Sequence, residues 1–473
     1  MSLIWDKNDD FSKWYSSLVK EGDLIEYGLV KGTIIMKPYA WSIWNNIQKA
    51  IDKYFKKLGT ENCYFPTFIP YSEFIKESQH IKGFAPELFK VTSIGDKILE
   101  DPLIVRPTSE IAFCNYFSSL SKSYNDLPIV LNQWCNAFRV EKNTKPFFRT
   151  SEFLWQEQHA IFATEKEAKE FSIKVINIYK DFMHKYMCIP VLMGEKTLYE
   201  RFAGAENTYT IETFMQDGQA LQSGTSHYLG QNFSKQFNIK FQTKNNVFEH
   251  VFQTSAGVST RLIGAMVLTH SDEKGLMLPS MIAPWKFAII CNAEKDYETN
   301  NVLTHIKSSM GSIIFKLDDS NKSFGAKLSE YELKGIPFQI IIGKKEVETK
   351  SITIYRRFTQ EKYSIGMEHL NFNYFRSLLE MHDNNLWKRA NDFLQSSITR
   401  VDNYDDFLWA IKNKKIVLTY WAGNEKDEKR LKDETGASSR CISWDHNHED
   451  QNGKECFYTK KPNAKLVYFA RAY

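Results

Sequence analysis

The chain has 473 residues, of which 42% are hydrophobic and 14% aromatic, so it can form about three domains with buried cores and is not a low-complexity chain. Lys and Arg total 61 against 57 Asp and Glu, a net charge of +4, and bulk charge therefore does not indicate a nucleic-acid partner. The seven Cys lack paired spacing, uncharged apolar stretches stay shorter than about 18 residues, and the first residues resemble no secretory signal. These features exclude a disulfide framework and a membrane span and predict a cytoplasmic protein.

Hydrophobic periodicity predicts the first elements. Residues 8–58 are expected to be helical, with a break at 28–32, and residues 62–70 to form a short apolar strand that ends in prolines. Residues 103–278 mix buried strands with amphipathic helices such as 165–186, without a regular alternation. This mixture favours an antiparallel sheet flanked by helices over a doubly wound parallel sheet.

The pattern changes after Pro284, where strands and helices alternate over about 80 residues, as in a compact α/β domain. A helical segment begins near Met367 and leads into a strand and a Lys-rich end. We therefore predict an α+β protein with an antiparallel-sheet domain over residues 1–284, an α/β domain over 285–385 and a small α/β domain over 386–473.

A predicted hairpin, FRVEKNTKPFFRTSEFLWQEQHAIF, carries the densest set of charged and aromatic residues. On a strand, Arg139 and Glu141 would project from one face because they are two residues apart. The same spacing on the returning strand gives one face Phe153, Trp155, Glu157 and His159. A buried charge must be paired or bound to a ligand, so the hairpin indicates a binding site. The alternative is a solvated face with ordinary cross-strand ion pairs.

Two further segments offer polar groups. RPTSEIAF contains Thr108 and Glu110, which can accept hydrogen bonds from an ammonium group, although Ser or Thr before Glu is also a helix-capping pattern. GQALQSGTSHYLGQNFS places Gln222, Thr225 and His227 between glycines, where the backbone can approach a ligand closely. Taken alone, His227 would more often be a hydrogen-bonded core histidine.

Together these segments resemble the class II aminoacyl-tRNA synthetases and, among them, the prolyl-tRNA synthetases. ENCYFP is similar to the first class II motif, whose proline helps to form a dimer interface. FRVE with FFRTSEFLWQEQH is similar to the second motif, and STR with GLMLPSMIAP to the third. HIKGFAPELFKVT (80–92) and RPTSE resemble signatures of the prolyl enzymes, and ELKGIP with FQIIIG resembles their anticodon-binding domain. The terminal tyrosine is typical of the archaeal- and eukaryotic-like branch.

The resemblance implies a homodimer that ligates L-proline to tRNA(Pro) in two steps: ATP-dependent formation of prolyl-adenylate with release of pyrophosphate, then transfer to the tRNA 3′ end. The attacking carboxylate is already an anion, so we expect catalysis by positioning and charge stabilisation without a general base. The interval between the second and third motifs is too short for the editing insertion of bacterial-type enzymes. We therefore expect no editing in cis and some activation of alanine.

The resemblance also assigns roles to residues, with Arg139 and Arg261 as the catalytic pair. The predicted proline-binding residues are Thr108, Glu110, Arg139, Trp155, Glu157, His159, Phe202 and His227. The predicted ATP-binding residues are Arg139, Glu141, Arg149, Thr150, Gln222, Thr225, Ser259 and Arg261. Gln222 is also expected to contact the Mg²⁺ that accompanies ATP. The anticodon is expected to contact Glu332, Lys334 and Arg357, which could equally form a solvated face.

The sequence departs from the family pattern in two places. Ala256 stands where a tryptophan is usual, which predicts a less filled pocket floor. Relatives often hold a C-terminal zinc with four cysteines, but here three of those positions are Ala422, Asp427 and Thr459, which leaves Cys456. We expect no structural zinc; a rebuilt Cys/His site is the less favoured alternative and would use Cys441, His446, His448 and Cys456.

Two other functions fit parts of the sequence. A synthetase-like RNA-binding or regulatory protein without ligase activity should have lost Arg139, Arg261, Thr108 or Glu110, all of which are present. A threonyl or glycyl enzyme is disfavoured because nothing near the site supplies a zinc to bind a hydroxyl group.

Overall fold

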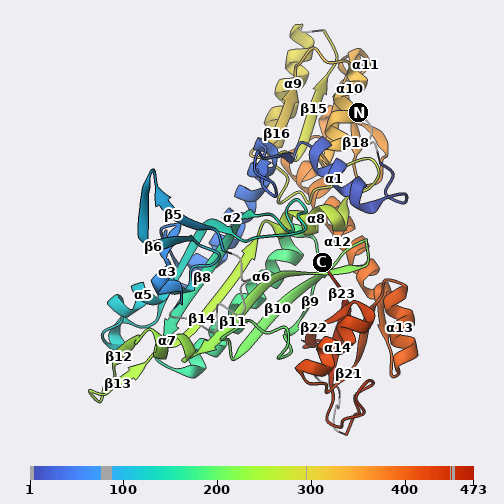
Figure 1. Ribbon diagram of the computed structural model, residues 1–473. Coiled ribbons are helices and arrows are strands. Elements are labelled where there is room, and N and C mark those ends of the chain that lie inside the picture. The colour runs from blue at the N-terminus through green and yellow to red at the C-terminus, as the bar shows by residue number, and fades with distance from the viewer. Residues whose placement is uncertain (1–4, 76–87, 295, 448, 450–452) are drawn as a thin grey trace.

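The computed structural model describes residues 5–75, 88–294, 296–447, 449 and 453–473 (Figure 1). A long central sheet forms the body of the molecule, the last strands of the chain extend this sheet at one end, and a second α/β domain lies above it. Within the described residues, no helix has the length and apolar character needed to cross a bilayer.

The N-terminal segment is less helical than predicted. Between α1 (Phe11–Glu21) and α2 (Pro38–Lys57), the chain forms an antiparallel hairpin of β1 (Ile25–Tyr27) and β2 (Ile34–Met36). The prediction of a mere break was wrong because the residues on both sides of the turn favour strands, and Ile25, Glu26 and Tyr27 pair with Met36, Ile35 and Ile34. The turn itself contains Gly32, whose φ of +86° favours glycine.

The central sheet confirms the predicted antiparallel architecture. Neighbouring strands from β7 to β9 run antiparallel, and β3 pairs parallel to β7 at the edge. In spatial order these strands are β3 (Glu61–Asn62), β7 (Ile129–Phe138), β8 (Glu152–Phe162), β14 (Phe252–Ser259), β11 (Gln219–Gly230), β10 (Asn207–Phe214) and β9 (Leu192–Glu195).

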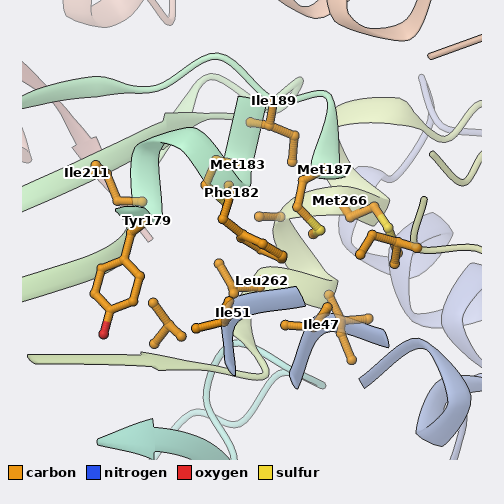
Figure 2. Close-up of a cluster of buried hydrophobic side chains, with 14 of the residues drawn as sticks. Ile47, Ile51, Tyr179, Phe182, Met183, Met187, Ile189, Ile211, Leu262 and Met266 are labelled. Atoms are coloured by element: carbon orange, nitrogen blue, oxygen red, sulfur yellow. The ribbon is translucent and has the colours of Figure 1, made fainter. Parts of the chain in front are cut away.

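The main core lies between this sheet and three helices. Helix α6 (Glu165–Met187) begins with a capping box in which Thr164 and Glu167 satisfy each other's backbone N–H groups. It packs against α2 and the short buried helix α8 (Arg261–His270), as Figure 2 shows. The buried residues labelled there include Ile47, Ile51, Phe182, Met187, Leu262 and Met266. Burial of these side chains fixes α8 against the sheet.

A smaller layer lies at one end of the central sheet. The predicted strand over residues 62–70 is instead split into β3 and β4, with Pro66 in the extended chain between them. Proline cannot donate to a sheet ladder, which explains the interruption. The layer contains β4 (Phe68–Pro70), α3 (Tyr71–Ile75), β5 (Lys90–Ile94), β6 (Lys97–Val105), α5 (Glu110–Leu120), α7 (Asn232–Gln236), β12 (Lys240–Gln242) and β13 (Phe248–His250).

The middle domain, β15 to β19, has the predicted α/β architecture. Its sheet order is β16-β15-β17-β18-β19, parallel across the first three strands and antiparallel beyond them. Its elements are β15 (Phe287–Cys291), α9 (Tyr297–Met310), β16 (Phe315–Asp318), α10 (Phe324–Leu333), β17 (Phe338–Ile342), α11 (Lys344–Glu348), β18 (Ser351–Arg356) and β19 (Lys362–Gly366). The central strands β15 and β17 are mostly apolar and almost wholly buried, as expected for strands covered on both faces, whereas the edge strand β16 carries the exposed Lys316.

The C-terminal domain, β20 to β23, is joined to the central sheet by strand pairing. Helix α12 (Phe372–Ser397) leads into it, so a domain boundary at residue 385 would cut a continuous helix. Strand β22 pairs with β9, and β23 continues parallel to β11. A Cβ atom on Gly194 would collide with the carbonyl oxygen of Ile442, so glycine permits this close approach. The elements are β20 (Ile398–Arg400), α13 (Tyr404–Lys412), β21 (Ile416–Trp421), α14 (Glu425–Thr435), β22 (Ala437–Ser443) and β23 (Lys465–Ala472).

Candidate active site

A cavity of about 640 Å³ opens on the central sheet, between β8, β11 and β14, the segment after β7 and the loop before β10. Every residue predicted to act in catalysis or to bind proline or ATP lines this cavity. They are Thr108, Glu110, Arg139, Glu141, Arg149, Thr150, Trp155, Glu157, His159, Phe202, Gln222, Thr225, His227, Ser259 and Arg261. The fold thus brings together, around one cavity, residues that are spread over more than 150 positions of the sequence, from Thr108 to Arg261.

The prediction from period-two spacing, that residues two apart share a strand face, is confirmed for the returning strand of the hairpin and wrong for the first. Phe153, Trp155, Glu157 and His159 lie on β8 and line the cavity as predicted. Strand β7, however, ends at Phe138, so Arg139 and Glu141 do not share a strand face. Beyond Phe138 the chain leaves the strand, although the backbone N–H of Arg139 still donates to Ser151 O of the returning segment at 2.9 Å.

One end of the cavity, which we call the carboxylate end, contains Thr108, Glu110, Glu157 and His159. The Thr108 hydroxyl donates to the Glu110 carboxylate, and both residues are buried. Glu110 is the first residue of α5, where the helix dipole favours a negative charge. The capping alternative is not observed, because Ser109 makes no side-chain cap and its hydroxyl instead donates to Glu157 Oε1 at 2.5 Å.

Glu157 is a buried carboxylate held by several donors. Gln133 Nε2 donates to its Oε1 at 2.7 Å, Cys135 Sγ lies 3.3 Å from the same oxygen, and His159 Nε2 lies 3.4 Å from Oε2. Burial acts to raise the pKa of Glu157, but the hydrogen bond and charge of His159 and the hydrogen bond from Ser109 outweigh it and lower the pKa. Glu157 therefore stays ionised and fixes the orientation of His159.

Sequence reasoning missed Ser109, Gln133 and Cys135. The register of the hairpin pairs Gln133 with Glu157. Cross-strand partners lie side by side. Aligning the two predicted strands of the hairpin would therefore have identified Gln133 as the residue opposite the Glu157 carboxylate.

Phe202 and His227 form a wall of the same cavity. Their rings stack with centroids 4.5 Å apart, and Thr208 Oγ1 lies 3.0 Å from His227 Nδ1. The Thr208 hydroxyl also accepts the backbone N–H of Phe202 at 3.2 Å. His227 thus lines the cavity with a defined orientation and is not a residue of the apolar core.

A second part of the cavity lining, which we call the cationic end, contains Arg139, Arg149 and Arg261. The Arg139 guanidinium lies over the rings of Phe153 and Trp155, at 5.2 and 5.6 Å from their centroids. Burial lowers the pKa of Arg139, and burial together with the charges of Arg139 and Arg149 lowers the pKa of Arg261 to about 10. Positive groups crowded in this way favour an anionic ligand such as a polyphosphate.

Helix α8 positions Arg261. Its Nε donates to Phe148 O at 3.0 Å. A Cβ atom on Gly264 would approach the Phe148 ring to 2.6 Å, so this glycine lets α8 pack directly on the segment that carries Arg149. Arg149 itself is exposed, and its Nη2 donates to the backbone oxygen of Tyr473 at 2.8 Å, which brings the last strand to the cavity edge.

The remaining predicted residues are held by local contacts. The Thr150 hydroxyl donates to Glu152 O at 2.6 Å, and Ser259 Oγ accepts from the Arg261 backbone at 3.3 Å. Gln222 lies on β11 opposite Glu212. Ala256 is buried and lines the cavity, so its small side chain does border the pocket.

The C-terminal domain does not present zinc ligands at the family positions. Asp427 caps α14 and pairs with Lys461 at 3.1 Å, while Cys456 lies buried in an aromatic cluster with Trp421 and Phe457. Of the rebuilt site, Cys441 is fully buried, His446 pairs with Glu449 at 2.5 Å, and His448 is outside the described residues. Across the described residues, no group of three or more His, Cys, Asp or Glu is arranged to hold a metal.

The predicted anticodon residues lie at the joint between domains. Arg357 is fully buried, and its guanidinium donates to both carboxylate oxygens of Asp272 and to Gly275 O. The Arg357 side chain thus ties the middle domain to the segment after α8, and its predicted contact with a base stays a prediction. Lys334 pairs with Asp23 at 3.3 Å, and Glu332 accepts from the Tyr355 hydroxyl.

Comparison with known proteins places this geometry in a family. Residues 89–270 match the tRNA synthetase class II core domain (G, H, P, S and T), residues 286–371 the anticodon binding domain, and residues 404–473 the C-terminal domain of prolyl-tRNA synthetase. The proline–tRNA ligase of Malacoplasma penetrans is 54% identical over 473 residues, all of both chains. This chain belongs to the prolyl-tRNA synthetases.

Other prolyl-tRNA synthetases agree. The proline–tRNA ligase of Ureaplasma urealyticum is 46% identical over 474 residues, covering 100% of this chain and 99% of that protein. The crystal structure of prolyl-tRNA synthetase from Cryptosporidium parvum, complexed with halofuginone and AMPPNP, superimposes with a TM-score of 0.95 at 34% identity and covers 100% of this chain and 97% of that one. The prediction of the family from six short motifs is confirmed. Of those motifs, residues 80–87 lie outside the described residues.

Proposed function

We propose that this protein activates L-proline with ATP and transfers it to tRNA(Pro). The observation that carries the proposal is the arrangement of the cavity, in which the arginines of the cationic end and the groups of the carboxylate end line one space of about 640 Å³. The named relatives are proline–tRNA ligases, and the Cryptosporidium parvum enzyme was crystallised with AMPPNP, an ATP analogue. These support proline and ATP as substrates.

In the first step, a carboxylate oxygen of proline forms a bond to the α-phosphorus of ATP. The bond from that phosphorus to the bridging oxygen breaks, and pyrophosphate leaves with the electron pair. Arg139, the member of the cationic end whose charge also interacts with Glu110 and Glu157, would hold the reacting carboxylate and α-phosphate together. Arg261, with Arg149, would hold the leaving pyrophosphate. An Arg fork suits phosphate oxygens, and stabilisation of charge in a dry site is the largest expected contribution.

Mg²⁺ is expected to accompany ATP in this family. The Gln222 amide oxygen, the Thr225 hydroxyl and the Glu141 carboxylate line the cavity and are the hard oxygen donors that Mg²⁺ prefers. They fit a cation that shares its other ligands with phosphates. Bound Mg²⁺ would neutralise part of the polyphosphate charge.

The carboxylate end would hold the secondary ammonium of proline. Thr108 and Glu110 offer acceptors for its two N–H groups, while Trp155, Phe202 and His227 surround the apolar ring. Glu157 and His159 would support this wall from beneath. Shape discriminates a missing methylene by only about 10- to 200-fold, so alanine should be activated weakly.

The second step transfers the prolyl group to the 3′ end of tRNA, with AMP leaving. The match of residues 286–371 to the anticodon binding domain supports a tRNA partner. Glu332 and Lys334 are half-buried, Arg357 is buried, and all three stay candidates for anticodon contacts. Between β8 and β14 the chain is accounted for by α6, β9, β10, β11, α7, β12 and β13, which supports the absence of an editing domain in cis.

A homodimer is also part of the proposal. Tyr64, Phe68 and Tyr116 are 67%, 52% and 44% exposed, and they lie near edge strand β3, in and beside the first class II motif. Large apolar side chains gathered at an edge strand indicate a surface covered by another chain. The proposal also includes a cytoplasmic location. It further includes membership of the archaeal- and eukaryotic-like branch, which the match to the C-terminal domain supports.

The deciding experiment is amino-acid-dependent exchange of labelled pyrophosphate into ATP with Mg²⁺, across the standard amino acids, followed by charging of a tRNA(Pro) transcript. We expect exchange with proline, weak exchange with alanine and prolyl-tRNA formation. Exchange with a different amino acid would contradict the pocket assignment. Folded protein without exchange for any amino acid would favour the non-enzymatic RNA-binding function.

A further inference from the structure

The cavity wall that carries Phe202 is a loop, residues 196–205 between β9 and β10, which we call the wall loop. Its residues from Tyr199 to Ala203 line the cavity. Phe202 is stacked on His227, so the position of the wall loop sets the space available beside the substrate ring. What fixes this loop therefore bears on substrate selection.

The start of the wall loop is bound to the C-terminal domain by buried polar groups. The Thr197 hydroxyl donates to Glu428 Oε1 of α14 at 3.0 Å and lies 3.0 Å from Ser439 Oγ of β22. Ser439 also donates to Glu428, whose side chain is 2% exposed. The three groups form one connected network, and removal of one hydroxyl leaves the others imperfectly satisfied.

A second buried contact lies beside the first. Lys196 Nζ donates to Glu212 Oε1 at 2.7 Å, and Arg440 of β22 donates to Glu212 Oε2 through Nε and Nη2, at 3.0 and 2.7 Å. Both oxygens of one carboxylate are thus bonded by cations from the wall loop and from the C-terminal domain. Glu212 pairs across the sheet with Gln222, a residue of the cavity.

The cavity-lining part of the loop makes a third contact. Lys432 of α14 lies 3.5 Å from Glu200 Oε1 and 5.4 Å from the centroid of the Tyr199 ring. Both Tyr199 and Glu200 border the cavity. The C-terminal domain therefore contacts the wall loop both at its buried start and at the residues that line the cavity.

We propose that the C-terminal domain is a specificity element, in which Glu428, Arg440 and Lys432 act as positioning residues that hold the wall loop, and with it Phe202, against the amino-acid substrate. This inference rests on the proposed function. It gives the domain a role in substrate selection that uses no metal. If the wall loop is less firmly held, kcat/KM should fall more for proline than for alanine, because the proline ring makes more contact with Phe202 than a methyl group does.

The test compares kcat/KM for proline with kcat/KM for alanine in pyrophosphate exchange. A fraction of misfolded enzyme lowers both values by the same factor, so their ratio reports the pocket and not the amount of folded protein. Replacing Arg440 would leave Glu212 short of a partner and threaten folding. Milder variants are Thr197→Val, which keeps the side-chain shape, and Lys432→Gln, which removes a surface contact.

The matched control is Arg430→Gln. Arg430 lies on the same helix α14, but its Nε donates to Tyr458 Oη of its own domain at 2.7 Å. We expect Thr197→Val and Lys432→Gln each to lower the proline-to-alanine ratio by about three- to tenfold, with the KM for ATP within about twofold, as for the loss of part of one ring contact. Arg430→Gln should leave the ratio unchanged.

A double variant, Thr197→Val with Glu428→Gln, sharpens the test. Because both residues belong to one network, the ratio in the double variant should fall by less than the product of the single effects. An unchanged ratio in both Thr197→Val and Lys432→Gln, in an enzyme that activates proline, would overturn the inference alone. A wild-type protein that activates no proline would contradict the proposed function, and this role with it.

Discussion

The cationic end and the carboxylate end of the cavity stabilise their charges in different ways. At the cationic end, burial and the charges of Arg139 and Arg149 lower the pKa of Arg261, so the binding of an anion beside Arg261 relieves an existing repulsion. At the carboxylate end, Glu157 already has its hydrogen bonds from Ser109 and Gln133. The first end is therefore organised for a ligand that brings charge, whereas the second is organised to keep a shape.

The largest effect is expected at the cationic end. Arg261→Ala should lower the rate of proline-dependent pyrophosphate exchange by about 1,000-fold or more, because the charge on the leaving pyrophosphate loses its preorganised partner. Arg261→Lys should recover little, since a lysine cannot form the bidentate contact. Light scattering should give the same molecular mass for Arg261→Ala as for the wild-type protein. A rate within tenfold of wild type would remove Arg261 from the catalytic pair.

The next largest effect separates the two ends. Glu110→Ala or Thr108→Ala should raise the KM for proline by about 30- to 100-fold, as expected when a charged hydrogen bond is lost in a buried site. The KM for ATP should change by no more than about threefold, because the cationic end is untouched. Steady-state exchange at varied proline and varied ATP measures both constants. Equal increases would contradict the role of these residues as the ammonium anchor.

A smaller effect is expected for Arg149, which is exposed and shares its guanidinium with the backbone of Tyr473. Arg149→Gln should raise the KM for ATP by about three- to tenfold and leave the KM for proline unchanged, since solvent screens an exposed charge. The effect should shrink as salt is added. A loss as large as that of Arg261→Ala would show that Arg149 becomes enclosed when ATP binds.

The smallest expected effect concerns stability at the carboxylate end. The pKa of Glu157 lies below its ordinary value of 4.5, so its ionisation stabilises the fold above pH 4.5, and this contribution is lost as pH falls through the lowered pKa. Glu157→Gln should lower the free energy of unfolding at pH 7 by about 1–3 kcal/mol. Urea titrations of both proteins should show this difference narrowing below pH 4.5. A difference that grows in acid would contradict an ionised Glu157.

The sequence predicted the residues of the site better than their geometry. Period-two spacing correctly placed Phe153 to His159 on one face, because β8 is a regular strand throughout that segment. It failed for Arg139, because β7 ends at Phe138. Where a strand ends depends on its pairing with the neighbouring strand, which the spacing of residues does not show. Ser109 shows a similar limit. Its local sequence favours a helix cap, but in the fold its hydroxyl instead donates to Glu157, which is distant in the sequence.

Local pattern by itself determined the fold class, the α/β character of the middle domain and the chemistry available at the site, because hydrophobic period and residue type act over short distances. Tertiary structure decided the rest. It buried Arg357 in the joint between two domains, and it joined β22 to β9 so that the C-terminal domain contacts the wall loop. Contacts between segments 85 or more residues apart leave no periodic trace in the chain, since each segment depends on the folded surface of the other.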